Sequence, residues 1–385
     1  MADQVAAGPG GIRNRGASDY LACVVQAIAH VPEMRDTLLF WDGVPGRNEG
    51  ILEQVRDGGV GLAEAAGEGE GGAIVAGALR RLVARLVVLG GEEGSEETAG
   101  LDDLCRAFGW GRDDIVQQDV NEMFRLLLSK LDEELAGFEV VGRDNVAIEP
   151  REDHVSRVAM VNTIRVAAAA CGHSSTRVTP SLGINVTVEN QSGLEESLRN
   201  VTLAAETVSD YRCSTCDAQG DVILSHQFIH PLPPVLMFDL SRIGFSFETF
   251  QSVKILDRFE FPFELDMADF VEDNEEEEEG VQGSTLYELA VVVCHTGRAT
   301  RGHYLAHVKV PSSGEWWKVD DSTVTRSVID TTQDMETLFG DGTSPTTAYK
   351  LIYRRVDEEA AGANGLTPTD LVSPVLMELS HLADA

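Results

Sequence analysis

The part of the chain that begins at about residue 155 is a succession of strand-like segments, and no other feature restricts the fold as much. In these segments apolar residues alternate with polar ones or form continuous runs, and turn residues separate the segments. The segments are GINVTVEN, PPVLMFDLSRI, FQSVKILDRFEF, YELAVVVCHT, HYLAHVKV, EWWKVDD and AYKLIYRR. Together they predict a long, antiparallel β half.

The preceding part of the chain has helical periodicity instead. Residues 72–91 are strongly apolar but contain Arg80, Arg81 and Arg85, so they predict an amphipathic helix rather than a membrane span. A second helix is expected within residues 113–135, with five apolar residues on one face: Val116, Val120, Phe124, Leu127 and Leu131. A helical half followed by a β half is typical of the α+β class.

Composition restricts the partners of the protein. The 385 residues suffice for one large multi-lobed domain or two to three smaller ones, and the 43% hydrophobic content is that of a globular protein. The net charge of −34 makes nucleic acid a poor partner and favours a protein with a basic face, although acidity can also serve solubility alone. The run DNEEEEEGVQG at 273–283 indicates a solvated acidic insertion, because adjacent like charges do not pack into a core.

Cysteine spacing and the first residues favour the cytoplasm or the nucleus. The six cysteines, at positions 23, 105, 171, 213, 216 and 294, have no spacing typical of a disulfide framework, which favours a reducing compartment. The opening MADQVAAGPG lacks the basic and apolar regions of a signal peptide. We therefore expect no membrane association.

The stretch GIRNRGASDYLACVVQAI, residues 11–28, predicts a glycine turn that leads directly into a helix beginning near Ser18 or Asp19. The expected apolar face consists of Leu21, Val24, Val25 and Ile28. This layout typically places a reactive side chain at a helix N-terminus, where backbone N–H groups and the helix dipole lower the pKa of a thiol. The residue at that position is Asp19, which has no thiol.

A second group of chemistry-bearing residues lies further along the chain. His303 follows Gly302 at the start of a strand, and Asp320 and Asp321 follow a short hairpin that begins near Pro311. In such a hairpin Asp320 can return beside His303 and orient its imidazole, as in Cys-His-Asp and Ser-His-Asp enzymes. A His and an Asp on neighbouring strands are more often a structural pair, so this pair alone does not indicate an enzyme.

A longer series of motifs runs in order along residues 11–355. After the glycine turn and its helix come QQDVNE, CSTC, LPPVLMFDL, DRFEFP, YELAVVVCHTG, RGHYLAHVK, WWKVDDSTV and AYKLIYRR. This order resembles the catalytic domain of the ubiquitin-specific proteases. The resemblance implies an α+β fold of papain-like cysteine-protease type, a hand whose helical thumb, β fingers and antiparallel β palm hold ubiquitin. In that family the thumb contributes a catalytic Cys and the palm contributes His and Asp.

The resemblance also implies a division of the chain. We expect a flexible N-terminus at 1–10, the ubiquitin-specific protease-like domain at 11–355 and a C-terminal tail at 356–385. Within the domain the expected parts are the thumb at about 11–155, the fingers at about 156–230 and the palm at about 231–355, with the acidic insertion at 273–283.

Residue by residue, the resemblance assigns catalytic positions. His303 falls at the position of the base, Asp320 at that of its orienter with Asp321 next to it, and Asn14 at the side-chain donor of the oxyanion hole. Asp19 falls where the nucleophilic Cys belongs. A carboxylate is a poor nucleophile toward an amide, and beside His303 it is expected to form an ion pair that spoils the imidazole as a base.

Two further sets of residues are carried over. Asp119 and Glu122 match acidic positions that meet arginines of the ubiquitin tail, and they are expected on one helix side because they are three apart. Cys23, four residues after Asp19, is the only nearby thiol, and it is expected to be a buried small apolar side chain rather than a displaced nucleophile.

The zinc ribbon of the family is degenerate in this chain. The pair Cys213 and Cys216 is whole, but Ala168 replaces the first residue of the other pair and leaves Cys171. Three thiolates leave a tetrahedral site open unless His173 completes it. We therefore expect no cofactor, with zinc weak or absent.

Three functions are consistent with these residues. The preferred one is a module that binds ubiquitin or ubiquitinated proteins and has lost its cysteine chemistry. The second is an active deubiquitinase with an unorthodox nucleophile, either Asp19 activating water or Cys23 substituting for the Cys. The third is a scaffold that no longer binds ubiquitin.

Overall fold

The structure is a computed structural model that divides into two compact units. It describes residues 8–14, 16–39, 74–89, 98–111, 115–135, 158–166, 174–202, 206–228, 232–271, 284–311, 313–327, 329 and 331–356. The first unit combines residues from 1–154, 290–335 and 362–385, and the second combines residues from 155–289 and 336–361. Strand β12 (Leu286–Arg298) begins in the second unit and continues into the first.

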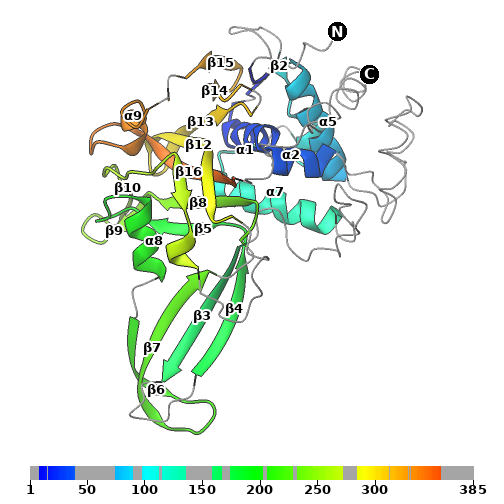
Figure 1. The fold of residues 1–385 in the computed structure, drawn as a ribbon. Helices are drawn as coiled ribbons and strands as arrows, with labels where there is room; N and C mark the ends of the chain where they lie inside the picture. Colours follow the sequence, from blue (N-terminus) through cyan, green and yellow to red (C-terminus); the bar gives the residue numbers. More distant parts are fainter. Residues whose placement is uncertain are drawn as a thin grey trace. The chain divides into compact units, whose positions relative to one another are not determined.

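The helices of the first unit surround one buried helix, α1 (Asp19–His30), whose twelve residues are all buried. It packs against α2, α5, α7 and strand β13 (Figure 1). A helix that is covered on every side can be apolar all round, which agrees with the sequence DYLACVVQAIAH. The neighbouring helices are α2 (Pro32–Leu39), α5 (Ile74–Leu89), α6 (Asp102–Ala107) and α7 (Val120–Leu135).

The strands of the first unit place the predicted His and Asp side by side. Strand β13 (Arg301–Lys309) pairs antiparallel with β12 and β14 (Trp316–Asp320), and β14 pairs with β15 (Thr323–Arg326). The β14–β15 turn contains Asp321 with φ of 54°, a left-handed conformation that Asp tolerates in turns. A short parallel pair, β1 (Gly11–Ile12) and β2 (Thr98–Ala99), leads into α1.

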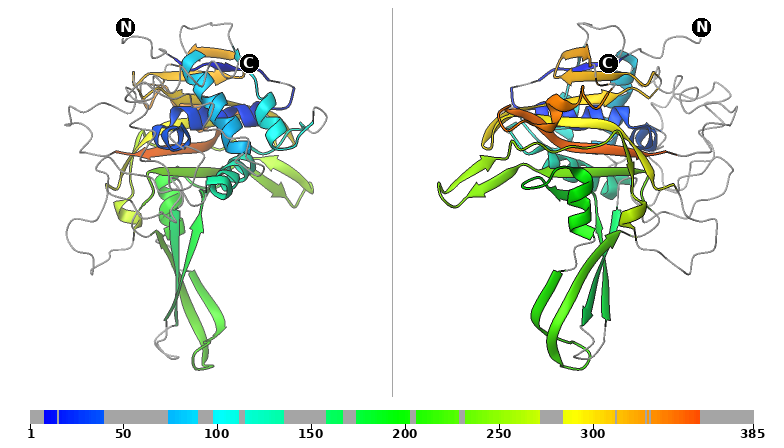
Figure 2. Two further views of the ribbon diagram at one scale, coloured as in Figure 1. Left: turned by 90° about the vertical axis from the view of Figure 1, so that its right-hand side faces the viewer. Right: turned by 60° about the vertical axis from the view of Figure 1, so that its left-hand side comes forward.

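The second unit contains a four-stranded antiparallel sheet with the order β4-β3-β7-β6 (Figure 2). The strands of this sheet are β3 (Val158–Val166), β4 (Ser174–Ser181), β6 (Glu206–Arg212) and β7 (Gln219–Phe228). The remaining elements are β5 (Ile184–Thr187), α8 (Leu194–Thr202), β8 (Val235–Ser241), β9 (Ile243–Ser246), β10 (Gln251–Lys254), β11 (Glu264–Asp266), a 3₁₀ helix (Ala268–Phe270), α9 (Glu336–Phe339) and β16 (Thr346–Arg355).

Arg242, directly after β8, connects several segments of the second unit by hydrogen bonds. Its guanidinium is completely buried and donates to the carbonyl oxygens of Ala348, Ile255, Asp257 and Phe339 at 2.8–3.1 Å. These carbonyls come from β16, the segment after β10 and the end of α9. The rigid donor fork of Arg suits this task, because one side chain satisfies four buried acceptors.

Two local expectations need correction. Val116 does not belong to the helix of residues 113–135, because α7 begins at Val120 and Val116 is 52% exposed in the extended segment before it. Strand β5 runs parallel to β8, whereas the strand pairs β8–β16, β3–β4, β3–β7 and β6–β7 are antiparallel. The connection from β5 to β8 contains α8, β6 and β7, and such a long crossover permits parallel pairing where a hairpin does not.

Some predicted segments lie outside the described residues: the whole acidic insertion at 273–283, the tail beyond residue 356 and residues 1–7. Of the predicted N-terminal segment 1–10, the structure describes residues 8–10, which are buried. No helix among the described residues is long and apolar enough to cross a membrane. The division into thumb, fingers and palm stays a prediction.

Candidate active site

Asp19 is the first residue of α1, and its carboxylate is buried with 3% exposure. Its Oδ2 accepts a hydrogen bond from the backbone N–H of Tyr304 at 2.8 Å and lies 2.9 Å from His303 Nδ1. Gln117 Nε2 donates to Oδ1 at 3.2 Å. Burial by itself raises the pKa of this carboxyl, but the bonds from His303 and Tyr304 outweigh burial and hold the pKa below its ordinary value.

His303 lies near the start of β13, and its neighbour Gly302 makes room for the packing of this hairpin. A Cβ on Gly302 would lie 2.1 Å from His295 Nε2 and 2.4 Å from the Thr296 carbonyl oxygen, so a larger residue would force both to move. Across the hairpin, His303 is in register with Thr296 of β12. The site therefore depends on glycine immediately before the histidine.

The imidazole of His303 bridges two carboxylates. Nδ1 faces Asp19, and Nε2 lies 2.7 Å from Oδ1 of Asp320. The hydrogen bond to Asp19, followed by the one to Asp320, raises the pKa of His303 from 6.5 to about 10. The imidazole is therefore protonated at neutral pH and donates to both carboxylates.

Asp320 has a second cationic neighbour, Lys318, two residues earlier on β14. Lys318 Nζ lies 3.1 Å from Asp320 Oδ2. The hydrogen bond from His303 is the largest cause, and the one from Lys318 a further cause, of the low pKa of the Asp320 carboxyl. Asp320 thus stays ionised and orients the imidazole.

Asn14 and Asp321 connect the loop before α1 to the β14–β15 turn. Asn14 Nδ2 donates to Asp321 Oδ2 at 2.7 Å, and Asn14 Oδ1 accepts from the N–H groups of Gly16 and Ser18. The backbone N–H of Ile12 also donates to the Asp321 carbonyl oxygen at 2.9 Å. Burial raises the pKa of Asp321 in spite of the bond from Asn14.

Cys23 is buried one turn further along α1. Burial, with the nearby charge of Asp19 as a further cause, raises the pKa of this thiol well above its ordinary value. The neutral thiol of a fully covered side chain is not a competent nucleophile. Its environment is that of a core residue, as the sequence predicts.

Asp119 and Glu122 lie three residues apart at the N-terminus of α7. Asp119 precedes the helix, and its Oδ1 accepts from the N–H groups of Asn121 and Glu122 at 2.8 and 3.2 Å, which makes it the N-cap. The hydroxyl of Tyr304 lies 3.5 Å from its Oδ2. Glu122 is exposed in the first turn of α7.

Sequence reasoning did not identify Gln117, Tyr304 or Lys318 as parts of the site. Lys318 and Asp320 are two apart on a strand, so their common face was detectable from the alternation of side chains. Nothing local indicates Gln117 or the backbone N–H of Tyr304, which reach Asp19 from 98 and 285 residues away.

Two groups of residues contain side chains of the kinds that bind metal ions. In the described part of the chain, only His303, Asp320 and Asp321 place three such ligand atoms within 4.8 Å of one another, and a cation there would have to displace the proton that His303 shares with Asp320. In the β6–β7 turn Cys213 is buried and Cys216 exposed, while Ala168, Cys171 and His173 lie outside the described residues. The two described thiols do not make a tetrahedral zinc site.

The arrangement of Asp19, His303 and Asp320 stabilises charge, and none of these three side chains carries a thiol. A protonated imidazole has no free lone pair with which to accept a proton, so it cannot act as a general base near pH 7. The Asp19 carboxylate is ionised, buried and saturated with hydrogen bonds, which lowers its reactivity further.

Comparison with known proteins identifies the class to which this fold and site belong. Residues 10–353 match the family described as ubiquitin carboxyl-terminal hydrolase, and the chain therefore belongs to that family. Mouse (Mus musculus) ubiquitin carboxyl-terminal hydrolase 40 is 29% identical over 311 residues, which are 80% of this chain and 22% of that protein. Ubiquitin carboxyl-terminal hydrolase 15 of Schizosaccharomyces pombe is 27% identical over 322 residues, which are 83% of this chain and 24% of that protein.

Solved structures confirm the fold. The SAGA Ubp8/Sgf11/Sus1/Sgf73 DUB module bound to ubiquitin aldehyde matches with a TM-score of 0.67 and 21% identity, over 92% of this chain and 71% of that one. The α+β fold of the ubiquitin-specific protease type is thus confirmed. The chain spans less than a quarter of the length of the two curated relatives described above.

Proposed function

We propose that this protein is a ubiquitin-binding module of the family in which Asp19 stands at the position of the nucleophilic Cys, so that cysteine chemistry is lost. One observation carries the proposal: the side chain that meets His303 Nδ1 from the N-terminus of α1 is a carboxylate, at 2.9 Å. In the Cys-His-Asp devices of the family, that place belongs to the attacking thiol.

The electrostatics of the site support inactivity. Asp19 and Asp320 together keep His303 protonated, whereas a general base must be neutral at working pH. Cys23 cannot replace the missing thiol, because it is buried and its pKa is raised. The route through a displaced thiol is therefore disfavoured.

Ubiquitin recognition is supported by acidic and aromatic groups. Glu122 is exposed, and Asp119 keeps a carboxylate at the start of α7, where both can meet a basic peptide tail. In the second unit, the turn between β9 and β10 exposes Phe247 by 81% and Phe250 by 76%. Exposed aromatic clusters of this kind mark protein-interaction surfaces. The matched DUB module was itself solved bound to ubiquitin aldehyde.

The test combines a binding assay with a cleavage assay. We expect the wild-type chain to bind ubiquitin in calorimetry but not to cleave a fluorogenic ubiquitin C-terminal amide. Asp19→Cys should place a thiol at a helix N-terminus next to His303, and we expect cleavage or labelling by a ubiquitin with a C-terminal electrophile. Asp19→Ala is the matched control, because it also removes the ion pair but supplies no nucleophile.

The outcomes separate the alternatives. Labelling of Asp19→Cys that disappears in the double variant with His303→Ala supports the proposal. Wild-type turnover that survives Asp19→Ala and disappears with Cys23→Ser would assign the chemistry to Cys23. If the wild-type chain is folded but does not bind ubiquitin, the result would support the third function, a scaffold that no longer binds ubiquitin.

A further inference from the structure

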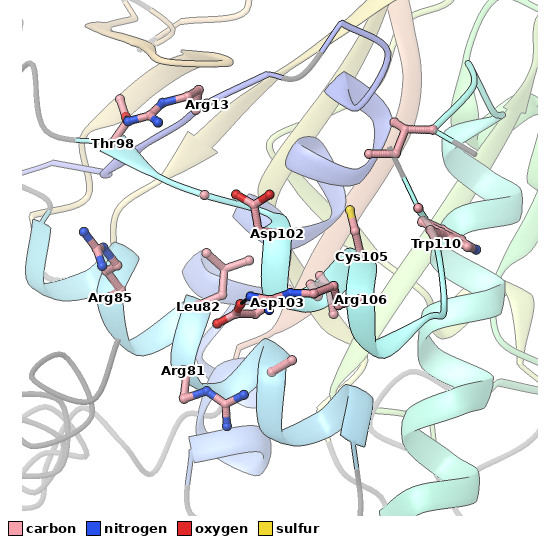
Figure 3. A pocket seen from close by; sticks show the side chains of 15 residues that line it. Arg13, Arg81, Leu82, Arg85, Thr98, Asp102, Asp103, Cys105, Arg106 and Trp110 are labelled. Carbon is pink, nitrogen blue, oxygen red and sulfur yellow. Dashed lines mark hydrogen bonds and ion pairs between the residues drawn. The ribbon is translucent and has the colours of Figure 1, made fainter. Parts of the chain in front are cut away.

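A pocket of about 670 Å³ lies in the first unit, between α5, α6 and the β1–β2 pair (Figure 3). None of its lining residues belongs to the group around His303. Arg81 and Arg85 enter it from α5. Arg13 enters it from the residue after β1, Thr98 from β2 and Trp110 from the segment after α6. Its volume lies in the range that binds small molecules or short peptide segments.

Positive charge predominates in this pocket. Four arginines and two aspartates line it, and Arg106 is paired with Asp103. Arg13 donates weakly to Thr98 Oγ1 at 3.4 Å. Among the described residues Arg81 makes no hydrogen bond or ion pair, and its side chain is partly exposed. In a chain of net charge −34, such a concentration of arginine is not explained by average surface composition.

Apolar side chains lie beside the arginines. Leu82 and Leu104 line the pocket and are buried, and Trp110 stacks on Phe108 with ring centroids 4.7 Å apart. Figure 3 shows Trp110 on the side opposite Arg85 and Arg13. The pocket therefore offers cationic and apolar surface to the same ligand.

The spacing of the arginines favours an extended ligand over a single compact anion. Arg81 and Arg85 are four residues apart on α5, which places them on one face at a rise of about 6 Å. Alternate side chains of an extended peptide repeat at about 6.6–6.8 Å. Two carboxylates separated by one residue thus match the two guanidinium positions, and the intervening residue points elsewhere.

We propose that this arginine pocket binds an acidic peptide segment of a partner protein, in extended conformation and with acidic residues at alternate positions. Arg81 and Arg85 pair with two carboxylates, because guanidinium and carboxylate form charge-assisted hydrogen bonds. Apolar side chains between the acidic ones point to the opposite side of the peptide, where Figure 3 shows Trp110. The proposal is independent of ubiquitin binding and of the chemistry at Asp19.

The test uses fluorescence anisotropy with a labelled Glu-Leu-Glu-Leu-Glu-Leu peptide at low ionic strength. We expect saturable binding that Arg81→Gln weakens about tenfold, the equivalent of one charge-assisted pair. Arg199→Gln is the matched control: Arg199 is an exposed arginine on α8 of the second unit, paired with Glu195, and the variant changes the net charge equally. Its binding should stay within twofold of the wild type. The affinity of Arg81→Lys for the peptide should lie between those of the wild type and Arg81→Gln, because lysine keeps the charge but lacks the planar guanidinium.

Hydrogen exchange of the wild-type chain is a readout that needs no variant. The peptide should slow exchange in α5 and around residues 98–106, and protection confined to other segments would overturn the proposal. The proposal would also be overturned if the peptide did not bind, or if Arg81→Gln and Arg199→Gln lost the same amount of affinity for it. Displacement by inorganic phosphate, at an ionic strength where sodium chloride does not displace, would identify a small-oxyanion site instead.

Discussion

At the scale of single residues, the decisive feature is that one imidazole is shared by two carboxylates. Asp19 and Asp320 approach opposite nitrogens of His303 at 2.9 and 2.7 Å. Each ionised carboxylate favours the charged imidazolium, and the two effects together exceed the cost of partial burial. With a protonated thiol at position 19, Asp320 would be the one carboxylate of this pair left beside His303.

We expect Asp19→Asn to lower the pKa of His303 from about 10, on the order of a tenfold loss of proton affinity, because an amide carries no charge. An NMR titration of the His303 ring measures this. His307, whose Nδ1 pairs with Ser327 Oγ, is an internal control that should not move. An unchanged His303 midpoint would contradict the ion pair as the cause.

The same pair makes stability depend on pH in a defined window. The raised pKa of His303 contributes stability that is complete below pH 6.5 and is lost as pH rises through about 10. The lowered pKa of Asp19 contributes stability that is complete above its ordinary pKa of 3.8 and is lost as pH falls through its folded value. The free energy of unfolding of the wild type should therefore exceed that of Asp19→Asn most between pH 3.8 and 6.5. The difference should shrink as the pH rises toward 10.

At the scale of elements, α7 combines two roles at its N-terminus. The Asp119 carboxylate satisfies backbone N–H groups that the helix leaves open, and it belongs to the proposed ubiquitin-binding surface. An experiment must therefore distinguish the proposed role of Asp119 in binding the ubiquitin tail from its role as the N-cap of α7. The chain offers variants that do so.

We expect Asp119→Ala to lower the free energy of unfolding by about 1 kcal/mol, whereas Asp119→Asn preserves it, because Asn caps as well as Asp. Both variants should weaken ubiquitin binding if the negative charge is used. Denaturant unfolding and calorimetry measure the two quantities, with Glu133→Gln, which removes an exposed carboxylate near the other end of α7, as the charge control. Full ubiquitin affinity in Asp119→Asn would restrict Asp119 to capping.

At the scale of the whole molecule, the net charge of −34 opposes the compact state by self-repulsion. At 0.1 M ionic strength, salt largely screens the repulsion between exposed charges that are more than about 10 Å apart. We expect the melting temperature at pH 7 to rise by about 2 °C or more between low and moderate sodium chloride, roughly 1 kcal/mol for domains of 150–250 residues. Potassium chloride should act equally at equal ionic strength. A melting temperature that falls with salt would show that attractive ion pairs dominate instead.

The sequence by itself determined the class and the elements that hold the site. The helix beginning at Asp19 and the return of Asp320 beside His303 were predictable, because helix periodicity and a short hairpin depend on residues close together in the chain. Burial of Cys23 followed equally from its place one turn beyond Asp19 on an apolar helix. These features need no knowledge of distant segments.

Only the tertiary structure decided what surrounds Asp19 and where α7 begins. Gln117 and the N–H of Tyr304 reach the carboxylate from other elements, and their positions depend on how α1 packs against β13 and the segment before α7. The extended position of Val116, the parallel pairing of β5 with β8 and the arginine pocket have the same origin. Periodicity describes one segment at a time, whereas these contacts are set by packing and hydrogen bonding between segments far apart in the sequence.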